Sequence, residues 1–166
     1  MTPILTGQTD VVSGWITNTT TLKPLGPDRI DLRLWDAGVR LYALPYYATK
    51  DTIEKKADML AAYIRAASKG WEYALKNTEK TVDFLVKEYP TLKREDEIEG
   101  SKALLTFAFN ANTAANGWGA FDPAVWAEQI KLYDDLKQFT AGAPKLEDVI
   151  TTKILDATKA QRAKVG

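Results

Sequence analysis

The residues near the start of the chain that best suit binding chemistry are Trp15, Thr17 and Asn18, which end a short apolar run, Asp10–Trp15. An indole face packs against a planar or alkyl solute, while a neighbouring hydroxyl and amide orient it. The same residues also suit a structural role, with the indole in the core and Thr17 or Asn18 as a helix cap. From the residues alone, both interpretations stay open.

Two further aromatic groups are candidates. Tyr42, Tyr46 and Tyr47 lie in one extended segment, where aromatic residues more often pack against other strands than form a stacking platform for a ligand. The loop Asn116–Gly119 places glycines on both sides of Trp118. Because glycine permits backbone turns that other residues resist, we interpret this loop as a turn pinned by a buried indole.

Composition excludes several classes of function. The chain has no cysteine and no histidine, and therefore no thiol nucleophile, no thiolate or imidazole metal ligand and no imidazole base. The acidic run Glu95–Glu99 is expected to be a solvated helix start, since consecutive helical residues diverge and do not surround a metal ion. We predict no metal, no cofactor and no catalytic residue.

Charge and hydropathy set further limits. The 22 basic and 22 acidic residues cancel, so no net field draws the chain to nucleic acid. No stretch approaches the roughly 18 apolar residues of a membrane span. We therefore expect neither nucleic-acid binding nor membrane insertion.

Three segments that could position the candidate residues read as strands. Asp10–Trp15 is typical of a strand buried on both faces, Ile30–Leu34 alternates apolar and charged residues, and Val39–Ala48 is an extended segment interrupted by Pro45. In open α/β sheets, ligands collect beyond the carboxyl ends of strands. We therefore expect Trp15, Thr17 and Asn18 at such an edge.

Helical periodicity begins after Ala48. The spacing predicts a long helix from Asp51 past Ala74, a helix from Asn77 to Pro90, one from Glu95 to Phe109, one from Asp122 to Phe139, and a last one near residues 154–163. Gly70 in the first helix is interpreted as a position of close packing beside Trp71. The predicted fold class is α/β, with a few strands followed by four or five helices.

The order of these pieces also resembles a known family. GQTDVVSGW at residues 7–15, PLG at 24–26 and DAGVRLYALPYYATKDTIEKKADMLAAYIRAASKGWEYALKNTEKTVDFLVKEYP at 36–90 are similar to the C-terminal half of periplasmic solute-binding proteins of ABC importers. The nearest group is the one that binds sulfonate, nitrate and thiamine pyrimidine, to which the fungal thiamine-pyrimidine synthase is related. The likeness extends over nearly the whole chain and rests on order and spacing rather than on one motif.

The resemblance implies a helix-rich part of a two-lobed binding-protein fold, with residues 1–50 as the remainder of the second lobe and hinge and residues 51–166 as a helical region that packs on the first lobe. It implies capture of a small organic or anionic solute in the periplasm and delivery to an ABC permease. It also places Tyr42 beside the cleft with Trp15, Thr17 and Asn18. Exported members begin with a signal segment and an N-terminal half, so the resemblance implies that this chain is a fragment.

Two other functions stay open. An enzyme of thiamine-pyrimidine synthesis is one, although the cysteine-rich motif of that enzyme is replaced here by Leu41–Pro45. A helical interaction module is the other. We also expect the isolated chain to expose apolar faces at Ile64, Trp71, Leu105 and Phe109, and to self-associate by exchange of helices between two copies.

Overall fold

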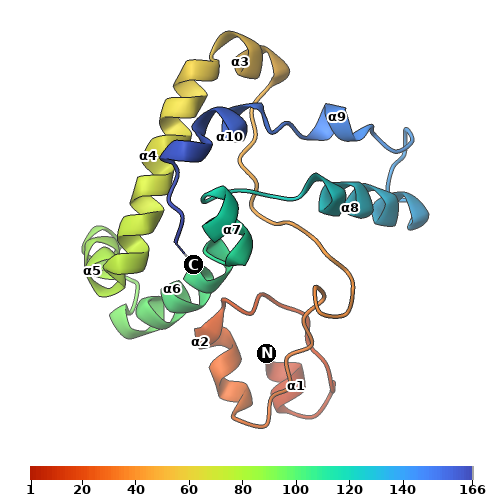
Figure 1. Cartoon of the computed structure of the whole chain (residues 1–166). Helices are drawn as coiled ribbons and strands as arrows, with labels where there is room; N and C mark the ends of the chain where they lie inside the picture. Colours follow the sequence, from red (N-terminus) through yellow and green to blue (C-terminus); the bar gives the residue numbers. More distant parts are fainter. Residues whose placement is uncertain (166) are drawn as a thin grey trace.

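The computed structural model describes residues 1–165, and over these residues it contains helices joined by irregular segments and no β-strand. In chain order the elements are α1 (Thr2–Leu5), α2 (Thr19–Leu22), η1 (Lys23–Leu25), α3 (Lys50–Lys55), α4 (Ala57–Lys76), α5 (Thr78–Glu88), α6 (Arg94–Ala108), α7 (Ala111–Asn116), α8 (Pro123–Asp135), α9 (Leu146–Val149), α10 (Lys153–Thr158) and η2 (Lys159–Gln161) (Figure 1). The prediction of an α/β fold with a few strands is therefore wrong.

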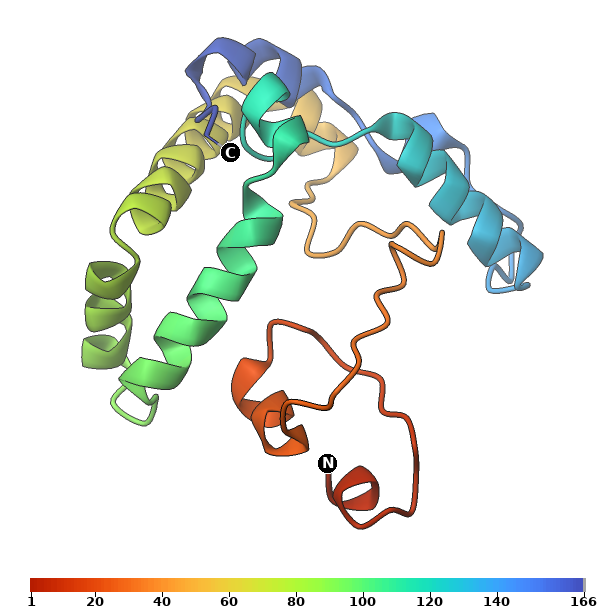
Figure 2. The ribbon, with the colours of Figure 1, turned by 60° about the horizontal axis from the view of Figure 1, so that its bottom comes forward.

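The three segments predicted as strands, Asp10–Trp15, Ile30–Leu34 and Val39–Ala48, have strand-like sequence patterns but no strand partners among residues 1–165. Within residues 1–165 they form no ladder with one another or with any other segment, and Figure 2 draws this part of the chain as an irregular trace between short helices. A strand-like pattern is a local property of one segment, whereas a ladder needs a second extended segment at about 5 Å. The sequence therefore predicted extended segments, but it did not show whether a partner lies beside them.

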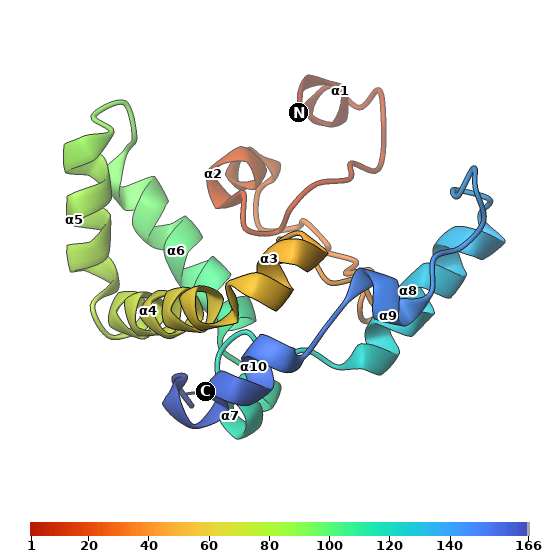
Figure 3. The ribbon, with the colours of Figure 1, turned by 90° about the horizontal axis from the view of Figure 1, so that it is seen from above.

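The helical part forms a curved arrangement around α4. Helix α4 packs against α5 on one side and α10 on the other, and α5 turns back to pack against α6. Figure 3 shows α5 and α6 at one end of the molecule and α8 and α9 at the other, with α3, α4 and α10 between them. Helix α2 reaches this arrangement by packing on α6.

The core lies where α6 ends and the chain turns towards α8. Its buried residues are Leu105, Phe109 and Trp118, with Ala67, Trp71, Ala74, Leu75, Ala108, Ala163 and Val165 packed around them. Trp71 and Trp118 stack with their ring centroids 6.0 Å apart. Burial of Trp118 confirms the interpretation of the 116–119 loop as a turn pinned by an indole.

The expected distribution of exposed apolar surface needs correction. Leu105 and Phe109 are buried, at 6% and 7% exposure, and Ile64 and Trp71 are half-buried, because α4, α6 and the C-terminal residues cover one another. The most exposed large aliphatic side chains lie instead in the first third of the chain, where Ile30 and Leu32 are more than four-fifths exposed.

Helix boundaries follow local capping chemistry, with some differences from the prediction. Thr49 rather than Asp51 caps α3, since its hydroxyl accepts a hydrogen bond from the Thr52 N–H. The long first helix is divided at Lys56 into α3 and α4. Asp122 caps α8 as predicted, its carboxylate accepting from the Ala124 N–H at 2.8 Å, with Pro123 as the first helical residue.

Two stretches were predicted incompletely. The stretch between the helices predicted at Glu95–Phe109 and Asp122–Phe139 contains α7, which begins with a capping box in which Asn110 and Thr113 exchange side-chain and backbone hydrogen bonds. Helix α8 ends at Asp135, before the predicted Phe139, and Lys137 follows with a positive φ of 55°.

No helix formed by residues 1–165 combines the length and apolar character that crossing a bilayer requires.

Candidate functional site

The predicted ligand residues at the start of the chain lie on the surface beside α2. The Trp15 side chain is 65% exposed on an irregular segment, and Asn18 is the N-cap residue of α2 without a side-chain capping bond. The carbonyl of Thr17 faces α6 at Gly100, where a β-carbon would lie 3.6 Å from that oxygen. The Trp15 side chain is therefore largely in solvent, and Thr17 contributes its backbone carbonyl to the contact with α6.

Tyr42 lies elsewhere, anchored to the start of α8. Its hydroxyl accepts a hydrogen bond from the Asp122 N–H at 2.9 Å, and its own N–H donates to the Gln129 side-chain oxygen at 3.2 Å. Its ring packs on Trp126, at a centroid distance of 5.8 Å, and also on Trp35 and Phe121. These contacts hold the extended segment against α8.

No hydrogen bond or ring contact among residues 1–165 joins Tyr42 to Trp15, Thr17 or Asn18, and none of the four lines either of the two cavities described next. Their assignment to a ligand site stays a prediction. Tyr46, the neighbouring tyrosine, lies on Trp118 and Tyr63, with ring centroids 5.9 and 5.6 Å away.

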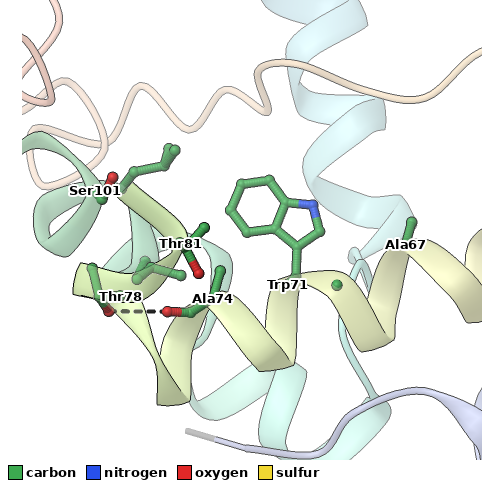
Figure 4. A pocket seen from close by; sticks show the side chains of 9 residues that line it. Ala67, Trp71, Ala74, Thr78, Thr81 and Ser101 are labelled. Carbon is green, nitrogen blue, oxygen red and sulfur yellow. Dashed lines mark hydrogen bonds between the residues drawn. The ribbon is translucent and has the colours of Figure 1, made fainter. Parts of the chain in front are cut away.

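An apolar groove lies between α4, α5 and α6. Its volume is about 410 Å³, within the range of pockets that hold small molecules. The residues that line it are Ala67, Gly70, Trp71, Ala74, Thr78, Thr81, Ser101, Leu104 and Leu105. Figure 4 shows the Trp71 indole extending from α4, with Thr81 and Ser101 to one side of it.

The polar atoms of the α4–α5–α6 groove are hydroxyls. Thr78 donates to the Ala74 carbonyl and Thr81 to the Asn77 carbonyl, each at 3.0 Å, so these hydroxyls offer a ligand their lone pairs. The Ser101 hydroxyl has no hydrogen-bond partner among residues 1–165 and can still donate. With no charged side chain in its lining, the groove suits a neutral planar or alkyl group that carries a hydrogen-bonding atom.

Gly70 has a different role from the predicted one. A β-carbon at this position would meet nothing within 4 Å, so Gly70 does not mediate close packing beside Trp71. It lines the groove, and the missing side chain leaves that part of the α4 wall open. Trp71 itself was recognised from the sequence as a member of the apolar helix face. The periodicity of apolar residues in that helix did not indicate that α5 and α6 would leave a groove beside Trp71.

A second, polar cavity of about 380 Å³ lies between α7, the start of α8 and the α10–η2 turn. Arg162 lines it and is 5% exposed. Its guanidinium donates to three backbone carbonyls: those of Asn116 and Leu155, each at 3.1 Å, and that of Trp118.

No carboxylate hydrogen-bonds to this guanidinium among residues 1–165. Burial lowers the pKa of Arg162 from its usual value, while the negative charge of Asp156 acts in the opposite direction. Three N–H donors of the guanidinium bind backbone carbonyls, so Arg162 ties the 116–118 loop to α10, while its buried Nε–H has no partner among residues 1–165. The sequence offered no signal for this role, which depends on residues far apart in the chain.

The acidic residues do not converge. Within residues 1–165 there is no group of three or more Asp or Glu side chains placed to hold a metal ion. Glu95, Asp96 and Glu97 form the first turn of α6, as expected for carboxylates near the positive end of a helix dipole.

Comparison with known proteins gives one match. Residues 1–81 match the family model described as NMT1/THI5 like. No curated protein and no solved structure matches the chain. The match supports the resemblance to the sulfonate, nitrate and thiamine-pyrimidine binding family over those residues, and with it a small-molecule-binding protein in general.

The matched segment and the groove overlap. Residues 1–81 include the α4 and α5 residues of the groove, from Ala67 to Thr81, whereas the α6 residues lie outside the match. A family so described includes solute-binding proteins and an enzyme of thiamine-pyrimidine synthesis, and the match agrees with either.

Proposed function

We propose that the chain is a solute-binding component of an ABC importer, or part of one, which captures a small organic or anionic solute without transforming it. The observation that carries this proposal is the open α4–α5–α6 groove, most of whose lining lies in the matched segment. Its size and its mixture of one indole, apolar walls and a few hydroxyls are those of sites that hold a small molecule by shape.

The lining sets the chemistry of the bound group. A planar or alkyl part of the solute packs against Trp71, and a carbonyl or ring nitrogen accepts a hydrogen bond from the Ser101 hydroxyl. Because no cation lines the groove, an anionic group of the solute remains towards solvent or is held by another surface. An aromatic sulfonate or carboxylate can place its ring against Trp71 and keep its anionic group outside the groove.

The residue types that line the groove support binding without chemistry. A hydroxyl becomes a nucleophile when a neighbouring base removes its proton, and the groove has no carboxylate, amine or imidazole to do so. The Thr78 and Thr81 protons are directed to backbone carbonyls instead. Location in the periplasm and delivery to a permease are parts of the same proposal and rest on the resemblance.

The test fills the groove without disturbing the packing around it. Gly70→Leu places a side chain where a β-carbon meets nothing within 4 Å, and it removes the only glycine of α4, a poor helix former, so the fold is expected to gain about 1 kcal/mol. Ala66→Leu is the matched control, because Ala66 is exposed on the same helix and does not line the groove.

Thermal-shift screening against sulfonates, nitrate, bicarbonate, pyrimidines and aromatic acids identifies the ligand, which raises the Tm by mass action. Calorimetry then compares the variants. We expect binding by the parent chain and Ala66→Leu, and at least tenfold weaker binding by Gly70→Leu. Equal binding by Gly70→Leu would place the site elsewhere, and chromatographic conversion of the ligand to a product would favour the enzyme over the binding protein.

A further inference from the structure

The segment of residues 29–34 exposes a strand-like face that no other part of residues 1–165 covers. Ile30, Leu32 and Leu34 are 84%, 89% and 62% exposed. Arg29 donates two hydrogen bonds to the Asp31 carboxylate, at 2.8 and 2.9 Å, so these two side chains lie together on the other side, as the twofold alternation of an extended backbone requires.

Most of the backbone of this segment is also unpaired. Within residues 1–165, no N–H group of residues 29–34 and no carbonyl of residues 29–32 takes part in a hydrogen bond, whereas the carbonyls of Arg33 and Leu34 accept from the N–H groups of the turn that follows. A row of free donors and acceptors beside exposed aliphatic side chains is the surface that pairs with another extended chain. The extended segments on either side are less suited. Val39–Ala48 contains Pro45 and a positive φ at Leu44, and residues 10–15 include Gly14 and no cation to pair with Asp10.

We propose that two copies of the chain associate by antiparallel pairing of residues 30–34 about a twofold axis at Leu32. In this register Leu32 faces Leu32 of the second copy, and Ile30 faces Leu34. On the opposite face, Asp31 faces Arg33 of the second copy. The Leu32–Leu32 pair, two Ile30–Leu34 pairs and two Asp31–Arg33 ion pairs form at once, because an isologous contact repeats every pair by symmetry.

Neighbouring registers lack this complementarity. An axis at Asp31 places Asp31 against Asp31 and Arg29 against Arg33, and like charges directly opposite each other oppose pairing. An axis at Ile30 pairs Arg29 with Asp31 but sets Asp28 against Leu32. A shift by a single residue puts charged side chains opposite aliphatic ones. The sequence Ile30–Leu34 is therefore self-complementary about Leu32, which is the reason for assigning the partner as a second copy.

The charges available at this surface permit the pairing. Asp31 contacts Arg29, and Arg33 contacts Asp36 at 2.6 Å, and in both pairs the side chains are partly or largely exposed. Such surface ion pairs contribute little, so Asp31 and Arg33 can share their partners across the axis. The equal numbers of basic and acidic residues leave no net repulsion between copies.

Engineered cysteines test the register, and the absence of native cysteine makes each of them unique. Directly opposed residues of an antiparallel pair have Cα atoms about 4.5–5.5 Å apart, within disulfide range. We expect Leu32→Cys to form a disulfide-linked dimer under mild oxidation at least tenfold faster than Ile30→Cys alone. An equimolar mixture of Ile30→Cys and Leu34→Cys chains should cross-link as a mixed dimer.

Charge exchange tests the ion pairs. Asp31→Arg and Arg33→Asp should each weaken dimerisation in sedimentation equilibrium at least tenfold, and the double variant should restore it. Circular dichroism should be unchanged in all three, because both side chains are exposed. A parent chain that is monomeric at 100 µM would overturn the proposal. So would equal cross-linking at positions 30 and 32, or a dimer that the charge variants do not affect, as exchange of helices would produce.

Discussion

Ser68 provides the sharpest test of how the C-terminal residues are held. Ser68 is fully buried on α4, and its hydroxyl oxygen accepts a hydrogen bond of 2.8 Å from the Ala163 N–H. The Ala163 carbonyl in turn accepts from the Trp118 N–H at 2.7 Å. Through its N–H and its carbonyl, Ala163 therefore links α4 to the loop that carries the central indole.

The substitution Ser68→Ala removes the acceptor and leaves the Ala163 N–H without a partner. An unsatisfied buried donor costs about 1–3 kcal/mol, and because Ala163 is half-buried we expect the lower part of that range, about 1–2 kcal/mol. Alanine is also a better helix former than serine, by up to about 0.5 kcal/mol, which offsets part of the loss.

Ser101→Ala is the matched control, since it makes the same change in α6 at a hydroxyl with no partner among residues 1–165. The gain in helix propensity is the same in the two variants, so the difference between their free energies of unfolding reports the hydrogen bond of Ser68. With a urea m-value of about 2 kcal/mol/M, the midpoint of Ser68→Ala should lie about 0.5–1 M below that of Ser101→Ala. Coinciding midpoints would refute the assignment of this bond as a link between α4 and the C-terminal residues.

Two further predictions follow from the loop and from the tyrosines. Gly117→Ala should destabilise the fold by about 1–3 kcal/mol in urea unfolding, since Gly117 has a φ of +87° and a β-carbon there would lie 3.2 Å from Arg162. Gly119→Ala, with a φ of +79° but its nearest contact at 3.9 Å, should cost less, and the reverse order would contradict the crowding by Arg162. The charge of Tyr46 is the main cause that raises the pKa of Tyr63, with smaller contributions from burial and a hydrogen bond to Tyr46. As the pH rises, the Tyr63 phenol therefore keeps its proton to a higher pH in the folded state than in the unfolded state. Its contribution to the free energy of unfolding is fully present below pH about 10 and declines as the pH rises further. NMR titration of ring-labelled tyrosine should find a lower Tyr63 pKa in Tyr46→Phe, and an unchanged value would exclude Tyr46 as the cause.

The elements that the sequence predicted correctly are those whose chemistry is local. Asp122 followed by Pro123 predicts the start of α8 because the cap and the first turn are made by adjacent residues. The acidic start of α6 and the end of α5 before Pro90 have the same basis. The Asn110 capping box was equally local, and it was missed because the surrounding glycine and asparagine residues favoured a loop.

The tertiary structure decided everything that depends on a partner distant in the chain. Residues 10–15, 30–34 and 39–48 carry strand-like patterns, yet they form no sheet, since each lacks a neighbouring extended segment. The groove against Trp71 exists because α5 folds back onto α6, and Arg162 acquires its role because three backbone carbonyls meet at one point. Periodicity states which face of an element is apolar, whereas the side chains that cover that face, or leave it open, are set by contacts between segments far apart in sequence.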